Sequence, residues 1–257
     1  MYLIKTLSKG QRVFINKLRK KVGKTIYKQQ LIKDGDCVLI GVSGGKDSMA
    51  LVDIIASQQK AFPFKYKIKV AHITVKQLPQ LADIEKIKSL CQFHKLEFHH
   101  IEVDIDFNRD PSLSTCFKCS WGRRSRLFRL VEELGCNKLA FGHHLDDANE
   151  TLFMNILFNG EISSLPYSVK MFKGKFDLIR PLLDIEDQDL TYYTKLLDLK
   201  AETRKCPNTK INRRDLIRKT LSEFYKIHPG IKRNVFRAPQ KYIKKYLPLP
   251  LSDKESN

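Results

Sequence analysis

The stretch from Val38 to Met49, which reads VLIGVSGGKDSM, constrains the fold of this chain more than any other feature. Four apolar or small residues end at Gly41, a short polar turn follows, and an apolar helix is expected from Met49. An order of strand, glycine-rich loop and helix points backbone N–H groups and the positive end of a helix dipole at one spot. The stretch therefore predicts a phosphate-binding turn at the end of a buried strand.

Two common phosphate loops do not fit these letters. The mononucleotide loop needs glycine where the chain has Ile40 and Ser or Thr where it has Asp47, and the dinucleotide fingerprint fails at Ser43. What remains resembles the pyrophosphate-binding loop (PP-loop) of the family that splits ATP between its α and β phosphates. That resemblance implies an ATP site formed by Ser43, Gly44, Gly45, Lys46, Asp47 and Ser48. In it the glycines allow close backbone approach, Lys46 supplies positive charge and Asp47 helps to hold Mg²⁺.

Apolar segments and helical patterns alternate along the chain, and this alternation predicts parallel strands joined by crossover helices. Strands are expected at 36–42, 66–75, 96–105, 137–142 and 176–180, and the main helices at 49–59, 81–94, 117–134, 146–159 and 187–197. The predicted fold class is therefore α/β: a three-layer sandwich with a mostly parallel five-stranded sheet, PP-loop and Rossmann-like, plus basic helical extensions at both ends. The expected domains are a basic helical extension at 1–34, the ATP-binding domain at 35–200, a basic helical region at 201–245 and a tail at 246–257.

The charge of the chain is strongly positive, with 47 basic against 28 acidic residues and a net charge of +19. The excess is concentrated between Lys5 and Lys33, between Lys118 and Arg129, and between Arg204 and Lys245. Such clusters favour a polyanionic partner, and nucleic acid is the commonest one. No apolar run reaches roughly 18 residues and no signal peptide is recognised, so we expect a cytoplasmic protein without a membrane partner.

Six cysteines in a chain expected to be intracellular do not indicate a disulfide framework. Three of them, Cys37, Cys91 and Cys136, lie in apolar surroundings and are predicted to be small core residues. Cys116 and Cys119 form a C-x-x-C at the start of a helix, where the helix dipole and nearby basic residues stabilise thiolates. With Cys206 they make a set of three, which suits a [4Fe–4S] cluster with one open iron, or zinc completed by a further ligand.

A second polar block, Gly142 to Asp147, follows the predicted fourth strand, where α/β sheets bind ligands. Together with it, the chain resembles the tRNA 2-thiocytidine synthetase group of PP-loop proteins. The matching segments are SGGKDS at 43–48, CFKCSWGRR at 116–124, GHHLDDANETLFMN at 142–155, IRPL at 179–182, RKCPN at 204–208 and HPG at 228–230. The chain departs from the group at Thr209, where a second cysteine is usual, and in the short segment HITVKQLPQ after the second strand.

The resemblance implies that the chain adenylates a base carbonyl of tRNA, cytidine 32 by analogy, and replaces the oxygen with sulfur. It implies ATP and Mg²⁺ as cofactors, and a [4Fe–4S] cluster on Cys116, Cys119 and Cys206, with zinc as the fallback. The predicted catalytic residues are Lys46, Asp47, Arg123, Asp146 and Asp147, and His72, Gly142 and His143 join the loop in binding the cofactor. A sulfur donor, cysteine desulfurase or sulfide, is implied, and a homodimer is allowed.

Two alternatives stay open at this point. A tRNA lysidine synthetase-like ligase shares SGG-x-DS and an HH-x-DD-x-x-ET block that fits His143–Thr151, and it needs no cluster. An RNA-binding module with a zinc-stapled helix would need neither ATP nor sulfur transfer. Replacing the three cysteines with Ser should spare a lysidine-type activity and abolish sulfur transfer. ATP-dependent AMP formation in the presence of tRNA would distinguish an enzyme from the RNA-binding module.

Overall fold

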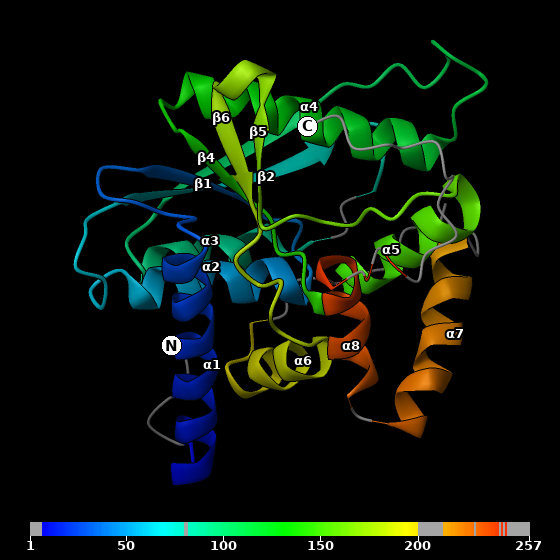
Figure 1. Ribbon diagram of the computed structural model, residues 1–257. Coiled ribbons are helices and arrows are strands. Elements are labelled where there is room, and N and C mark those ends of the chain that lie inside the picture. Colours follow the sequence, from blue (N-terminus) through cyan, green and yellow to red (C-terminus); the bar gives the residue numbers. More distant parts are fainter. Residues whose placement is uncertain are drawn as a thin grey trace, which may run out of the picture. The chain divides into compact units, whose positions relative to one another are not determined.

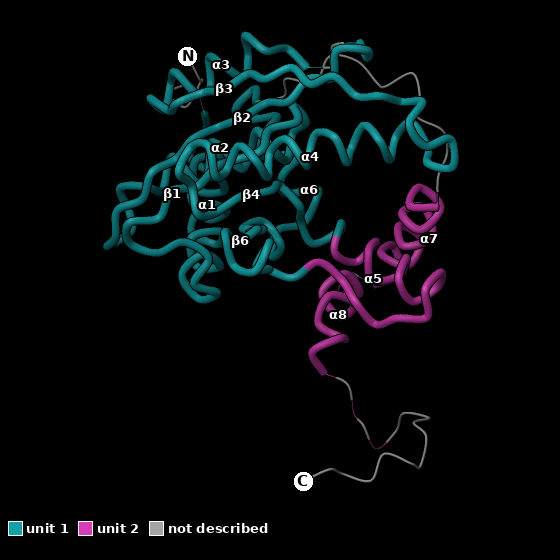
Figure 2. The backbone as a smooth tube through the Cα atoms, turned by 90° about the horizontal axis from the view of Figure 1, so that it is seen from above, with its two compact units in different colours: residues 1–147, 166–211 teal, residues 148–165, 212–257 magenta. Residues whose placement is uncertain are grey.

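The fold is described from a computed structural model, which defines residues 7–79, 82–199, 213–228, 230–241, 243 and 245. The chain divides into two compact units (Figure 2). Unit 1 comprises Met1–Asp147 and Pro166–Ile211, and unit 2 comprises Ala148–Leu165 and Asn212–Asn257. The domain boundaries predicted from the sequence stay a prediction.

Unit 1 is built on one sheet with the strand order β3-β2-β1-β4-β6-β5. The strands are β1 (Cys37–Gly41), β2 (Lys67–Val75), β3 (Glu97–Val103), β4 (Lys138–Ala140), β5 (Ser168–Met171) and β6 (Phe176–Ile179). All neighbours run parallel except β5, which pairs antiparallel with β6. The predicted mostly parallel sheet is confirmed, but it has six strands instead of five. The sequence does not predict the edge strand β5, because its alternation of polar and apolar residues, Ser-Val-Lys-Met, is only four residues long and the strand is largely exposed.

Helices cover both faces of this sheet, as the three-layer prediction requires (Figure 1). In β1 the side chains of Val38 and Ile40 join the apolar cluster of helices α1, α2, α3 and α6, whereas Leu39 joins the cluster of α4. The bounds of these helices are α1 (Lys9–Lys28), α2 (Lys46–Gln58), α3 (Ile84–Phe93), α4 (Thr115–Glu133) and α6 (Asp187–Leu196). A strand buried on both faces shows no polar alternation, which is why β1 reads as a continuous apolar run.

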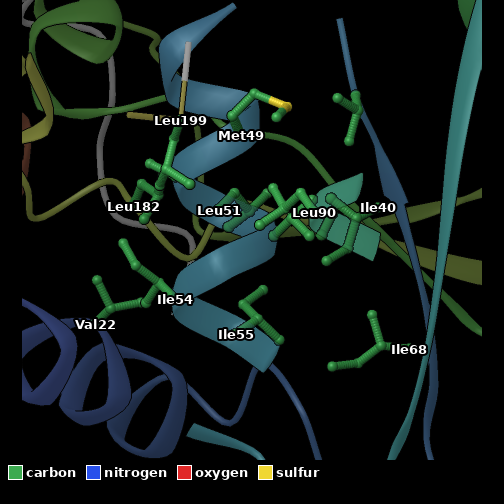
Figure 3. Packing of buried hydrophobic residues seen from close by; sticks show 14 of the residues in the cluster. Val22, Ile40, Met49, Leu51, Ile54, Ile55, Ile68, Leu90, Leu182 and Leu199 are labelled. Atoms are coloured by element: carbon green, nitrogen blue, oxygen red, sulfur yellow. The ribbon is translucent and has the colours of Figure 1, made fainter. Parts of the chain in front are cut away.

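Helix α2 lies at the centre of the larger apolar cluster (Figure 3). Its residues Leu51, Ile54 and Ile55 are fully buried and pack among Val22 of α1 and Ile40 of β1. This confirms the prediction that an apolar helix follows the loop and is buried against the sheet. Because α2 is fixed on several sides, its first turn and the loop before it are held in a defined position.

Helix α1 is one continuous helix, and a buried polar network attaches it to unit 1. Arg19 of α1 donates hydrogen bonds to Asp53 of α2 at 2.7 Å and to the hydroxyl of Tyr193 at 2.7 Å. Asp53, whose side chain is only 4% exposed, also accepts from Tyr193 and from His94, which follows α3. The carboxylate of Asp53 on α2 is therefore bound by side chains from α1, from α6 and from the end of α3.

Unit 2 contains the larger part of α5 (Leu145–Asn159), together with α7 (Arg213–Ile227) and α8 (Ile231–Arg237). Buried Glu150 accepts two hydrogen bonds from Arg218 of α7, at 2.7 and 3.1 Å. Fully buried Asn149 donates to the hydroxyl of Tyr225 and to the carbonyl of Lys232. Asn149 and Glu150, which follow the second polar block, thus hold α5, α7 and α8 together. A 3₁₀ turn at Ala238–Gln240 follows α8, and another, at Phe172–Gly174, joins β5 to β6 in unit 1.

Across the part of the chain that the structure describes, no helix has the length and apolar character needed to cross a membrane.

Candidate active site

The polar loop between β1 and α2 is closed by hydrogen bonds among its own residues. The hydroxyl of Ser48 accepts from the amide of Ser43 at 3.2 Å and donates to the carbonyl of Gly45 at 2.9 Å. The hydroxyl of Ser43 accepts from the amide of Gly45 at 3.2 Å. Gly45 precedes α2 without any side-chain cap, so the amides of the first turn stay available for a ligand. The two serines thus shape the loop.

Two glycines allow close approaches that no other residue would permit. Gly44 has φ of +88°, and a Cβ on it would lie 2.4 Å from that of Ala82. Gly142 comes after β4, and a Cβ there would lie 2.9 Å from the carbonyl carbon of Asp47. The loop after β1 and the block after β4 therefore touch through their backbones. They meet where the order of the parallel strands reverses, which is the expected ligand position in such a sheet.

A compact cluster of charges lies at this contact. Lys46 forms ion pairs with Asp47 at 2.6 Å and with Asp187 at 2.5 Å. His144, which is buried, lies 3.3 Å from the same oxygen of Asp187 and 3.4 Å from Asp147. Asp187, the first residue of α6, was missed by sequence reasoning. The available signal was the acidic run D-I-E-D-Q-D at 184–189, which stands out in so basic a chain.

Each charge in this cluster shifts the pKa of its neighbours. Burial lowers the pKa of Lys46, but hydrogen bonds to Asp187 and Asp47 outweigh it and the pKa is raised. The His144 imidazole follows the same pattern, because burial lowers its pKa while Asp187, Asp147 and Asp47 raise it above the ordinary value. The hydrogen bond with His144 lowers the pKa of Asp187 strongly, against burial and with the help of Lys46. The cluster therefore carries cationic Lys46 beside an anionic Asp187.

The two consecutive aspartates of the block hold helix starts in place. Asp146 accepts from the amide of Asp187 at 2.8 Å, which fixes the beginning of α6. Asp147 accepts from the amide of His144 at 3.0 Å, just before α5 begins. The side chain of His143 is half-buried, and its ring packs edge-on against Phe141 at 5.8 Å. The predicted catalytic roles of Asp146 and Asp147 and the predicted cofactor contact of His143 stay predictions.

His72 of β2 contacts the backbone just before the loop. Its Nδ1 lies 2.7 Å from the carbonyl oxygen of Val42, the residue just before the loop, and donates to it. Burial lowers the pKa of His72, and the nearby charges of His100 and Arg123 contribute to that shift. Arg123 of α4 is half-buried, and its Nε has no hydrogen-bond partner among the described residues. The predicted roles of His72 in cofactor binding and of Arg123 in catalysis stay predictions.

The two thiols of the C-x-x-C lie in the first two turns of α4. Cys116 is exposed and Cys119 is half-buried. Ser114 caps the helix, because its hydroxyl accepts from the amide of Phe117. Residues three apart lie on the same helix face, so both sulfurs can reach one metal centre. Cys206 lies outside the described residues, as does Thr209, so the convergence of the three thiols stays a prediction. Cys37, Cys91 and Cys136 are buried, which confirms them as core residues.

Known proteins similar to this chain point to one family. The PP-loop domain family matches residues 15–224. The tRNA-cytidine(32) 2-sulfurtransferase of Pseudomonas putida (strain W619) is 31% identical over 242 residues, covering 91% of this chain and 87% of that protein. The enzyme of the same name from Vibrio cholerae is 30% identical over 94% of this chain and 80% of its own length.

A solved structure of similar fold is that of the U34-tRNA thiolase NcsA from Methanococcus maripaludis with its [4Fe-4S] cluster. It superposes with a TM-score of 0.74 at 24% identity, over 90% of this chain and 78% of that chain. At this identity the superposition shows a shared fold and nothing further. The loop, the glycine contacts and the extent of these matches agree, and the chain belongs to the PP-loop domain family and, within it, to the tRNA-cytidine(32) 2-sulfurtransferase family.

Proposed function

We propose that this chain is an ATP-dependent tRNA sulfurtransferase that converts cytidine 32 to 2-thiocytidine. The observation that carries the proposal is the meeting of the loop 43–48, the block 142–147 and Asp187 at one end of the sheet, in a chain of this family. Relatives that carry the name of this reaction match the chain over 87% and 80% of their own length.

In the first step the carbonyl oxygen of the base attacks the α-phosphorus of ATP, and pyrophosphate leaves. The backbone amide and the ammonium group of Lys46 stabilise the charge that develops on the leaving pyrophosphate. Asp187 holds Lys46 at 2.5 Å and so fixes the position of its ammonium group. In the second step a sulfur nucleophile attacks C2 of the base, the bond between C2 and the adenylated oxygen breaks, and AMP departs.

The thiols fit the iron–sulfur group that this chemistry needs. Cys116 and Cys119 share one helix face at the start of α4, so both sulfurs can bind the same metal centre. We assign two ligands of a [4Fe–4S] cluster to them and the third to Cys206. When bound, such a cluster with three protein ligands would hold the sulfur at its open iron. The sulfur donor, cysteine desulfurase or sulfide, and a homodimer belong to the same proposal.

Magnesium would accompany ATP in this site. Among the described residues, Asp47, His144 and Asp187 form a group whose ligand atoms lie within 4.8 Å of one another. Mg²⁺ prefers oxygen ligands and keeps several waters, so the two carboxylates fit it and the imidazole does not. We assign Mg²⁺ to Asp47 and Asp187, with His144 holding the second carboxylate in place.

The test measures thionucleosides in tRNA digests from cells that lack the gene, complemented with variants. The wild-type chain should restore 2-thiocytidine, whereas Lys46→Ala and the triple Cys→Ser variant at 116, 119 and 206 should not. An unchanged 2-thiocytidine level in the deletion strain would overturn the proposal. A triple variant that still consumes ATP and joins an amine to the base would instead indicate a lysidine-type ligase.

A further inference from the structure

Two buried cysteines outside the candidate active site lie in direct contact. The sulfurs of Cys37 and Cys136 are 2.7 Å apart, although the two residues are separated by 99 positions in the sequence. Carbon atoms pack best at about 3.5–4.0 Å and sulfur is larger, whereas the sulfurs of a disulfide lie about 2.05 Å apart. The contact is therefore closer than packing requires, and a shift of about 0.7 Å would bring the two sulfurs to bonding distance.

The main chain around the two cysteines holds the pair together. Cys37 begins β1, and Cys136 lies in the turn between α4 and β4. The amide of Cys37 donates to the side-chain oxygen of Asn137 at 2.9 Å, and the amide of Asn137 donates to the carbonyl of Cys37 at 3.1 Å. The amide of Cys136 donates to the carbonyl of Val131 at 2.8 Å, at the end of α4. Backbone hydrogen bonds on both sides therefore fix the two residues beside each other.

The proposed function does not use this pair. The phosphate loop follows the last residue of β1, whereas Cys37 is the first residue of that strand. Among the residues that the structure describes, the two sulfurs interact with each other and with the carbonyl of Leu134, and they lie near the charges of Lys69 and Glu97. None of these groups belongs to the candidate active site, so the contact between the sulfurs needs a separate explanation.

Lys69 of β2 supplies a positive charge beside the two thiols. It is the register partner of Leu39, which follows Cys37 by two residues, so Lys69 and Cys37 lie on the same face of the sheet. Burial raises the pKa of the Cys136 thiol, the contact with Cys37 raises it further, and Lys69 opposes both effects. Since the thiolate is the form that reacts with oxidants, the pair should oxidise slowly at neutral pH and faster as the pH rises.

Solvent reaches this pair better than it reaches the third core cysteine. Cys37 is 9% exposed and Cys136 is 7% exposed, whereas Cys91 is 1% exposed and touches no other sulfur among the described residues. A peroxide is small enough to use such narrow access. The sulfenic acid that it forms on one thiol condenses to a disulfide only when a second thiol is within reach. Of these three cysteines, Cys37 and Cys136 meet that condition and Cys91 does not.

We propose that Cys37 and Cys136 form an oxidation site, at which a peroxide converts the two thiols to a reversible disulfide between β1 and the turn after α4. One thiolate attacks a peroxide oxygen, the O–O bond breaks, and a sulfenic acid and one water result. The second thiol attacks the sulfenic sulfur, the S–O bond breaks, and the disulfide and a second water form. The thiols lose two electrons and two protons, both taken up by the peroxide, and a dithiol reductant reverses the reaction by exchange.

Thiol counting and mass spectrometry test the proposal independently of the proposed function. The full chain with Cys116, Cys119 and Cys206 replaced by Ser keeps three of its six cysteines. After hydrogen peroxide, we expect one free thiol instead of three in the unfolded chain, a mass lower by about 2 Da for the two lost hydrogens, and a crosslinked peptide pair. Dithiothreitol should restore all three thiols. Three free thiols with unchanged mass, or an oxygen adduct without a crosslink, would overturn the proposal.

Single replacements in that background identify the bonded residues. Cys37→Ala and Cys136→Ala should each abolish the crosslink, whereas Cys91→Ala, the matched control, should form it at the wild-type rate. Lys69→Gln should slow the oxidation, because it removes the positive charge that favours thiolate. A crosslink that persists in Cys136→Ala would show that a different pair reacts and would refute the assignment.

The melting temperature gives a second readout on the same chain. A disulfide that closes a loop of about 100 residues restricts the unfolded state, so the oxidised chain should melt roughly 4–15 °C above the reduced one. Cys136→Ala, treated in the same way, should show no such rise. A crosslinked chain that melts no higher than the reduced chain would contradict a bond that fits the folded sheet.

Discussion

Asp187 is the residue on which the charges of the site depend. Its carboxylate pairs with Lys46 at 2.5 Å and lies 3.3 Å from His144. We expect Asp187→Asn to lower ATP-dependent AMP formation by about 10- to 100-fold, the usual effect of removing a residue that orients a catalytic group. Asp189→Asn, two positions later in the first turn of α6, is the matched control and should leave the rate unchanged. Equal rates for Asp187→Asn and wild type would remove Asp187 from the site.

His144 gives the protein a pH-dependent stability. Its pKa is raised above the ordinary 6.5 because Asp187, Asp147 and Asp47 outweigh the effect of burial. A raised folded-state pKa stabilises the protein fully below the unfolded-state pKa, and this contribution is lost as the pH rises through the folded-state value. We expect the wild-type melting temperature to fall across that window more than that of His144→Gln. An NMR titration that places the His144 pKa below 6.5 would contradict this.

Gly142 sets how closely the two active-site segments approach. A Cβ there would lie 2.9 Å from both the carbonyl carbon and the carbonyl oxygen of Asp47, and backbone atoms cannot move aside as a flexible side chain can. We expect Gly142→Ala to destabilise the protein by about 1–3 kcal/mol, as overpacking does, and to abolish ATP binding measured by calorimetry. Gly10→Ala is the control, because its Cβ would meet only the Ser8 hydroxyl at 4.0 Å. Unaltered ATP affinity in Gly142→Ala would show that the backbone at Asp47 can move away from the added Cβ without loss of the ATP site.

At the scale of elements, the attachment of α1 depends on the carboxylate of Asp53. Burial raises the pKa of Asp53, but His94, Arg19 and Tyr193 outweigh it and the pKa is lowered. The ionised Asp53 carboxylate therefore contributes stability above its unfolded-state pKa, and this stability is lost as the pH falls through its folded-state pKa. We expect Asp53→Ala to lower the free energy of unfolding in urea by about 3–5 kcal/mol, since it leaves Arg19 without its buried partner.

The comparison for Asp53→Ala is an exposed ion pair. Asp198 pairs with Lys86 at 3.0 Å, but its side chain is 79% exposed. Asp198→Asn, which removes the charge and still suits the positive φ of this residue, should therefore change the free energy of unfolding by less than about 1 kcal/mol. Similar losses in both variants would mean that the Asp53 network does not anchor α1.

The elements that the sequence predicts are those marked by a pattern of neighbouring residues. The loop 43–48 follows a continuous apolar strand, and the alternation of strands and helices required parallel pairing, so the sheet and the position of the site were predictable. The edge strand β5 and the contact of Asp187 with Lys46 were not. The alternation in β5 is only four residues long, and the ion pair joins residues 141 positions apart through the packing of α6 on α2.

At the scale of the whole molecule, the net charge of +19 predicts how tRNA binding depends on salt. Each phosphate neutralised by Lys or Arg releases counterions, so the logarithm of the binding constant falls linearly with the logarithm of the salt concentration. If six or more phosphates are contacted, the affinity should fall by about 10³-fold or more between roughly 50 and 200 mM salt.

The exposed lysines of α1 are expected to supply part of that slope. Lys17, Lys20 and Lys24 all face solvent, and no acidic residue lies between Lys5 and Lys33. Replacing the three with Gln should reduce the slope by about one for each phosphate contact that is lost, while 2-thiocytidine formation persists at low salt. The control replaces Lys170 and Lys173, which are exposed near the sheet edge outside the basic clusters. An equal change of slope per replaced lysine in the two variants would mean that only the total charge matters. A change confined to the α1 variant would locate a tRNA contact on that helix.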